Sequence, residues 1–148
     1  MMYNGVIVAA LISWAVAQLI KTCLHTIKFK TFYAQRLVGA GGMPSSHTSM
    51  VISALLTVGR KDGTGSTAFA LMFIMGAIVI YDAMGVRRAA GLHAREINKL
   101  KESVLEKDEN GKPLIMNGKK LQEYLGHTPL EVFGGAIVGI VIGLTVPI

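Results

Sequence analysis

Four long stretches of the chain carry no charged side chain, and they cover residues 1–20, 37–59, 63–81 and 132–148. A helix that crosses a membrane needs about 20 predominantly apolar residues, and lipid contact favours stretches that are apolar around the whole helix. The pattern therefore predicts an all-α, integral membrane bundle of four transmembrane helices, forming a single domain. The expected spans are about 3–20, 44–59, 64–84 and 130–148, with connections at 21–43 and 85–129.

The second stretch differs from the others because its first part, residues 39–47, is polar and rich in glycine. Its helix is expected to begin near Pro44, since proline suits the first helical turn. The apolar part that remains is short for a membrane span. Its start is therefore expected within the membrane, at a cavity lined by protein.

The first stretch allows two interpretations. Residues 15–17, Ala-Val-Ala, resemble the cleavage site of a signal peptide. A signal peptide also needs a basic residue near its start, and residues 1–4 contain none. A first membrane span is the favoured interpretation.

Composition narrows the class of protein. Hydrophobic residues make up 51% of the 148 residues and charged residues only 16%, which excludes a disordered chain. A single cysteine, Cys23, excludes a disulfide scaffold. The net charge of +6 could suggest nucleic acid, but aromatic residues are only 7% and the basic residues lie between apolar runs. No nucleic-acid partner is expected.

The basic residues mark one membrane face. The two connections that share a face carry Lys21, Lys28, Lys30 and Arg36, and then Arg87, Arg88, Arg95, Lys99, Lys101, Lys107, Lys112, Lys119 and Lys120. The turn between the second and third spans carries only Arg60 and Lys61. Because basic residues accumulate on cytoplasmic loops, these connections are expected in the cytoplasm, with both termini outside a cell membrane crossed several times.

The longer connection is expected to contain structure. Residues 86–106 form an amphipathic helical pattern, with Leu92, Ile97 and Leu100 or Val104 on one stripe. Its basic face could contact the anionic headgroups of membrane lipids. Residues 108–118 are rich in turn signals and could form a small hairpin, although Pro113 weakens a strand there.

Residues that could take part in catalysis occur at two helix starts on this face. The second span opens with residues 44–47, Pro-Ser-Ser-His, and the fourth opens with residues 126–131, Gly-His-Thr-Pro-Leu-Glu. A helix N-terminus binds anions such as phosphate, and Lys30, Arg36, Arg87 and Arg88 could neutralise phosphate oxygens. Two histidines there suit a two-step phosphoryl transfer, in which one attacks phosphorus and the other protonates the leaving alcohol.

Several of these residues have a second interpretation. Glu131 could complete a capping box with Thr128, or hold the ring of His127 in one tautomer. His47 could be a headgroup-level histidine without a catalytic task. His25 and His93 are expected at the surface. Asp82 lies at the end of an apolar span, where carboxylates are rare and usually paired, so we expect an ion pair with Arg36, Arg87 or Arg88.

These motifs resemble a known superfamily. Residues 44–47 resemble the Pro-Ser-Gly-His motif of the type-2 phosphatidic acid phosphatases and vanadium-dependent haloperoxidases, and residues 127–135 resemble its last motif, His-x-x-x-Asp-Val before a glycine-rich helix. With residues 81–91, the whole chain is most similar to the divergent bacterial branch, the YuiD-like proteins. The order of motifs matches, with four spans instead of the usual six.

The resemblance implies roles for individual residues. His127 would be the nucleophile that forms a phosphohistidine, Glu131 would orient it, and His47 would be the general acid. Phosphate would be bound by Lys30, Arg36, Ser45 and the Ser46 backbone N–H. The implied mechanism needs no metal and no cofactor.

The chain departs from the superfamily pattern at several positions. Lys30 and Arg36 have five residues between them instead of six, Leu121 occupies an arginine position, and Ser46 replaces glycine. Arg87 could supply the missing guanidinium. Arg87 and His93 also match the first half of the last motif, but Ile97 stands where its aspartate should be, so His127 is preferred.

Three functions follow as hypotheses. The first is a membrane phosphatase that hydrolyses a lipid phosphate on the cytoplasmic face, with Arg87 and Arg88 added to the phosphate site. The second is a non-catalytic protein that binds or transports phospholipid or phosphate headgroups, and the third is a purely structural membrane protein. A ridge of Gly135, Gly139 and Gly143 is expected to pack within the bundle or to build a homodimer.

Overall fold

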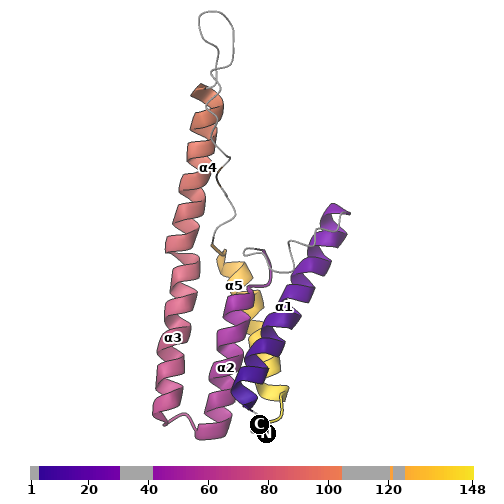
Figure 1. Cartoon of the computed structure of the whole chain (residues 1–148), viewed down its shortest axis with the longest axis vertical. Helices are drawn as coiled ribbons and strands as arrows, with labels where there is room; N and C mark the ends of the chain where they lie inside the picture. The colour runs from indigo at the N-terminus through magenta and orange to yellow at the C-terminus, as the bar shows by residue number, and fades with distance from the viewer. Residues whose placement is uncertain (1–3, 31–41, 105–120, 122–125) are drawn as a thin grey trace, which may run out of the picture.

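Figure 1 shows a computed structural model of the chain, which describes residues 4–30, 42–104, 121 and 126–148. The elements are α1 (Gly5–Phe29), α2 (Ser46–Asp62), α3 (Thr67–Met84), α4 (Val86–Val104) and α5 (Pro129–Thr145). No strand occurs within the described ranges, and the expectation of an all-α protein is confirmed. The possible hairpin at 108–118 lies outside the described residues.

α2 lies at the centre of the bundle, between α1, α3 and α5 (Figure 1). Its buried residues are small and mostly polar: Ser46, Thr48, Ser49, Ser53, Ala54, Thr57 and Val58. Small and hydroxyl side chains let helix backbones approach closely, and they form hydrogen bonds between helices in a membrane. The hydroxyl groups of Ser13 on α1 and Ser49 on α2 lie next to each other, and each donates to the other residue's backbone carbonyl over 3.0 Å.

The glycine ridge of α5 packs against α2. A Cβ atom built on Gly135 would stand 2.3 Å from the carbonyl oxygen of Ser45, and one on Gly139 would stand 2.6 Å from that of Ser49. Gly143 meets Ser53 in the same way, at 3.0 Å. The close approach therefore requires hydrogen in place of a side chain at these positions. The ridge was expected to pack within the bundle or to build a homodimer, and in the structure it packs within the bundle.

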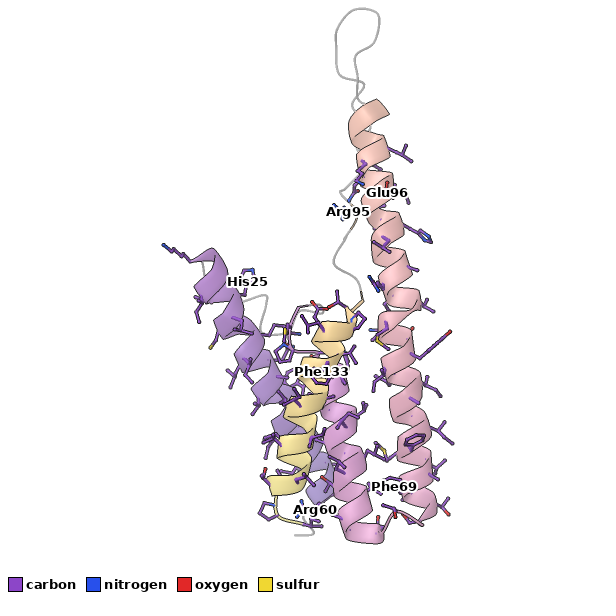
Figure 2. All side chains as sticks on the ribbon, turned by 180° about the vertical axis from the view of Figure 1, so that it is seen from behind. His25, Arg60, Phe69, Arg95, Glu96 and Phe133 are labelled. Atoms are coloured by element: carbon purple, nitrogen blue, oxygen red, sulfur yellow. The ribbon has the colours of Figure 1, made fainter. Side chains whose placement is uncertain are left out.

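The end of the bundle opposite α4 is closed by Arg60. Its Nη1 group donates hydrogen bonds of 2.9 Å to the carbonyl oxygens of Gly143 and Val146, in the last turn of α5 (Figure 2). These carbonyls have no partner within the helix, so the arginine satisfies them and fixes the end of α5 beside that of α2. α1 begins and α5 ends at this end (Figure 1).

α1 is longer than expected. The apolar pattern predicted a span at about 3–20, but the helix continues to Phe29. The charge of Lys21 does not end the helix, because its side chain is buried against neighbouring helices and lysine is a good helix former. The Thr22 hydroxyl group donates to the carbonyl of Gln18, and the Thr26 hydroxyl group donates to the carbonyl of Thr22. Both bonds lie in the part of the helix beyond the predicted span.

α3 and α4 follow one another in nearly the same direction, and α4 extends beyond the end of the bundle (Figure 1). Among the described residues, Gly5–Ile27 and Thr67–Lys101 are long and apolar enough to cross a membrane, and Pro129–Thr145 is apolar but shorter. The apolar side chains of α3 are largely exposed, for example Leu71 and Phe73. A four-span membrane bundle stays a prediction that suits these exposed surfaces.

α4 begins where the sequence predicted, and the face that it buries is Gly91, Ala94 and Asn98. Asn98 forms two hydrogen bonds with the backbone of Leu121, at 2.8 and 3.0 Å. The apolar positions Leu92, Ile97 and Leu100 remain exposed. Leu121 is therefore held on a face of small and polar residues of α4, and the predicted apolar stripe is not the face that α4 buries.

Candidate active site

The two helix-start histidines lie next to each other. His47 is the second residue of α2, and His127 directly precedes the N-cap of α5. Their ring centroids are 6.3 Å apart, with 52° between the ring planes. His127 is only 4% exposed, whereas His47 is exposed. The first turns of α2 and α5 meet at the end of the bundle from which α4 extends (Figure 1).

Glu131 makes both of the contacts that the sequence suggested. The hydroxyl group of Thr128 accepts from the Glu131 amide, and the Glu131 carboxylate accepts from the Thr128 amide at 2.9 Å, which is a capping box. The same carboxylate oxygen, Oε2, lies 3.3 Å from Nδ1 of His127. The two interpretations are compatible because His127 immediately precedes the cap.

The contact with Glu131 sets the chemistry of the His127 ring. A carboxylate accepts hydrogen bonds, so Nδ1 carries the proton in this arrangement and Nε2 keeps its lone pair. Burial lowers the pKa of His127, and the positive charges of Lys21 and Arg87 act in the same direction, while Glu131 raises it. The net effect is a lowered pKa, which favours the neutral, nucleophilic ring.

The backbone around His127 is held by α3 and α4. The His127 amide donates to the carbonyl oxygen of Ala83 over 2.9 Å. α3 ends at Met84, and carbonyls in a last turn are open to partners from outside the helix. Gly126 has φ +83°, and a Cβ there would stand 2.3 Å from the backbone nitrogen of Arg88. The position of His127 therefore depends on the junction of α3 and α4.

Ser45 and Ser46 form the start of α2. Ser45 is the N-cap residue, and its Oγ accepts from the amide and the hydroxyl group of Thr48. The Ser45 amide donates to the backbone carbonyl of Glu131 over 2.9 Å, which joins the first turns of α2 and α5. The side chain of Ser46 is 2% exposed. The first amides of a helix have no partner within it, so those of Ser46 and His47 can bind an anion.

The basic residues of the sequence hypothesis lie in different places. Arg87 Nε donates to Asp82 Oδ2 over 2.6 Å, so Arg87 is the partner of Asp82 within the part of the chain that the structure describes. Its charge also acts on His47 and His127. The side chain of Arg88 is exposed. Lys30 is the C-cap of α1 and is exposed. Arg36 lies outside the described residues.

One site residue was missed from the sequence, namely Lys21 on α1. Its side chain is only 3% exposed, and its positive charge acts on both histidines. The sequence analysis assigned it to a connection because it follows an uncharged stretch. Its helical register was the available signal, since Ser13, Ala17 and Lys21 are spaced four residues apart and share one face, and all three are buried.

Other candidates lie outside this group. His25, on the last turns of α1, lies beyond the helix starts, as do Arg95 and Glu96 on α4 (Figure 2). His93 is exposed on α4. Within the described part of the chain, no group of three or more His, Cys, Asp or Glu side chains is arranged to hold a metal ion.

Known proteins match this chain over nearly its whole length. The sequence model of the family described as "Divergent PAP2 family" matches residues 2–142. The chain is also 36% identical over 146 residues to a protein of Bacillus subtilis (strain 168) named "Uncharacterized membrane protein YuiD", and the match covers 95% of this chain and 92% of that protein. No solved structure matches. The match of the family model and of this relative over nearly the whole length shows that the chain belongs to the divergent PAP2 family.

Proposed function

We propose that the protein is a membrane phosphatase that hydrolyses a lipid phosphate through a phosphohistidine intermediate. The observation that carries the proposal is the histidine pair, with ring centroids 6.3 Å apart and the carboxylate of Glu131 beside Nδ1 of His127. A nucleophile, a group that orients it, and a second acid–base group within reach are the parts that covalent catalysis requires. Membership of the divergent PAP2 family supports the assignment.

In the first step, Nε2 of His127 attacks phosphorus and the bond from phosphorus to the ester oxygen breaks. His47 donates a proton to that oxygen, so the lipid leaves as an alcohol and a phosphohistidine remains. The negative charge of bound phosphate favours the protonated form of His47. The carboxylate of Glu131 stabilises the positive charge that develops on the His127 ring, as the aspartate does in a Ser-His-Asp triad.

In the second step, water attacks the phosphohistidine. His47, now neutral, accepts a proton from the water, and the phosphorus–nitrogen bond breaks. The electron pair returns to Nε2 of His127, and inorganic phosphate leaves. His47 is then protonated for the next cycle, so one group serves as acid and then as base.

The start of α2 is the proposed phosphate cradle. The amides of Ser46 and His47 and the helix dipole favour an anion there. Arg87 adds positive charge near both histidines. The roles of Ser45, Arg88, Lys30 and Arg36 as phosphate ligands remain part of this proposal, and the exposure of Lys30 and Arg88 suits contact with the outer parts of a headgroup.

A lipid substrate follows from the place of this site. α1 and α3 are long and apolar enough to span a membrane, and the histidines lie at one end of the helices. The basic residues of α1 and α4 are concentrated at this end, whereas Arg60 and Lys61 are at the other. By the positive-inside rule, we propose a multi-pass protein of the cell membrane whose site faces the cytoplasm, where anionic lipids are abundant.

The direct test is phosphate release by purified protein in detergent micelles. Phosphatidic acid, phosphatidylglycerol phosphate and an isoprenoid phosphate are offered to the wild type and to the His127→Ala and His47→Ala variants. His93→Ala is the matched control, because His93 is exposed on α4. We expect release by the wild type and by His93→Ala only. Equal release by the wild type and His127→Ala would rule out the phosphohistidine mechanism.

A second candidate is a non-catalytic protein that binds or transports phosphate headgroups on the same fold. The buried side chain of Ser46 favours it, because the related motif has glycine at this point and so leaves more room for phosphate. Orthovanadate binding that survives His127→Ala, without phosphate release by the wild type, would favour this candidate over the phosphatase.

A further inference from the structure

Lys21 on α1 is buried among the helices of the bundle. Lys21 is 3% exposed although it is a long charged residue, and such residues are almost never fully buried without a functional or paired environment. Lys21 lies on the face of α1 that packs in the bundle, together with Ala17, Gln18 and Thr22, all buried. The helical register therefore points its side chain towards α2 and α5, and away from lipid.

Ser13, eight residues before Lys21 on α1, is hydrogen-bonded to Ser49 on α2, so Lys21 lies beyond that contact, towards the end of the bundle where α2 begins (Figure 1). Its positive charge acts on His47 at the start of α2 and on His127 before α5. Lys30 lies nine residues later, about 13 Å further along the helix, and is exposed.

The charges around the histidines indicate that Lys21 has a role in anion binding. The described site contains two carboxylates, Asp82 and Glu131, and Arg87 forms an ion pair with the first. Glu131 contacts His127. A site with this balance disfavours a phosphate anion unless further positive charge is present. Lys21 supplies that charge from a third helix.

The neighbour of Lys21 on the same face is also suited to a polar ligand. Gln18 is 5% exposed, and its Oε1 atom has no hydrogen-bond partner among the described residues. Buried side-chain oxygens nearly always accept a hydrogen bond. An amide at this point suits a hydroxyl group or a protonated oxygen of a phosphate ester.

We propose that Lys21 is a phosphate ligand of the site and that its ammonium group binds the phosphate from the α1 side, opposite Arg87 on α4. This assignment rests on the proposed anion site between His47 and His127. It names a phosphate monoester as the preferred ligand, because two cations together with a helix N-terminus favour a dianion over the single negative charge of a diester.

The test compares Lys21→Met, Lys21→Arg and Lys21→Gln in the full-length protein in detergent. Lys61→Met is the matched control, since it removes an exposed lysine at the other end of the bundle. Binding of orthovanadate and of inorganic phosphate is measured by calorimetry, and helix content by circular dichroism. Lys21→Met is expected to weaken anion binding roughly 10- to 100-fold, while Lys61→Met leaves it unchanged and Lys21→Arg restores part of it.

Several results would overturn the assignment. One is anion binding by Lys21→Met within about twofold of the wild type, and another is absence of anion binding by the wild type. Where Lys21→Met loses its helix content, Lys21→Gln, which keeps a polar group, decides the question in the same assay. Wild type that binds orthovanadate through Lys21 but releases no phosphate from any lipid would refute the phosphatase and support the ligand assignment. If His127→Ala abolishes phosphate release while Lys21→Met binds anions as the wild type does, the phosphatase is supported and the assignment of Lys21 is refuted.

Discussion

A glycine-to-alanine pair on α5 tests whether close packing of α2 and α5 forms the site. Gly135→Ala would place a Cβ atom 2.3 Å from the carbonyl oxygen of Ser45, and the next nearest atoms are also backbone or Cβ atoms of Ser45. Gly134→Ala is the matched control on the neighbouring residue. Its Cβ would meet the end of the flexible Met43 side chain at 3.1 Å, which can move aside.

The expected magnitudes follow from this difference. Alanine in a helix is favoured over glycine by up to about 1 kcal/mol, and both variants gain this amount. In Gly135→Ala the first turns of α2 and α5 must separate, which costs about 1–3 kcal/mol for overpacking. The separation also weakens the hydrogen bond from the Ser45 amide to Glu131, worth about 1 kcal/mol. The net expectation is a loss of about 1–3 kcal/mol for Gly135→Ala and little or no loss for Gly134→Ala.

The assay is thermal unfolding in detergent, followed by orthovanadate binding and phosphate release. Because Ser45 precedes the helix turn that carries His47, the separation should also increase the distance between the histidines. Gly135→Ala should therefore lose anion binding as well as stability, and Gly134→Ala should keep both. Equal stability and equal anion binding in the two variants would refute the claim that the α2–α5 contact builds the site.

Three further predictions follow from the same contacts. Glu131→Gln should lower phosphate release by about 10²- to 10⁴-fold with a small change in thermal stability, because the amide can still cap α5 but cannot stabilise a charged His127 ring; a loss below about tenfold would contradict the orienting role. Because burial, Lys21 and Arg87 lower the pKa of His127, activity should persist below the ordinary histidine pKa of about 6.5 and fall only as the pH drops through the lowered value. Lys21→Met should move that acid limb to higher pH, and an unmoved pH–rate profile would count against the electrostatic contact. Asn98→Leu removes both bonds to Leu121 and should cost about 1–3 kcal/mol, seen as faster hydrogen exchange of the Leu121 amide, with exchange in α1 as the internal control. Unchanged exchange of this amide would show that Asn98 does not hold Leu121.

Features that depend on neighbouring residues were predictable from the sequence. The uncharged stretches located the helices, and the Thr-Pro-Leu-Glu pattern located the start of α5 at Pro129. Capping and helix propensity act within a few residues, so their signals are visible in a short window. The pairing of Asp82 with a nearby arginine belongs to the same class, because Arg87 is only five positions away.

The tertiary structure decided what depends on distances between helices. Lys21 was assigned to a connection because its charge ends an apolar run, but packing of α1 on its neighbours buries it, and its charge acts on both His47 and His127. The sequence left open whether Gly135, Gly139 and Gly143 pack within the bundle or build a homodimer. In the structure this ridge packs against the backbone of α2.

By itself, the sequence determined an all-α chain with apolar helices and two helix starts that each carry a histidine. Only the tertiary structure placed those histidines 6.3 Å apart and gave Glu131 its two simultaneous contacts. Apolar runs and caps are encoded by residues close in the chain. The site joins positions far apart in the chain, such as His47 and His127, which are 80 residues apart. Their separation in space is set by how small residues let α2 and α5 approach.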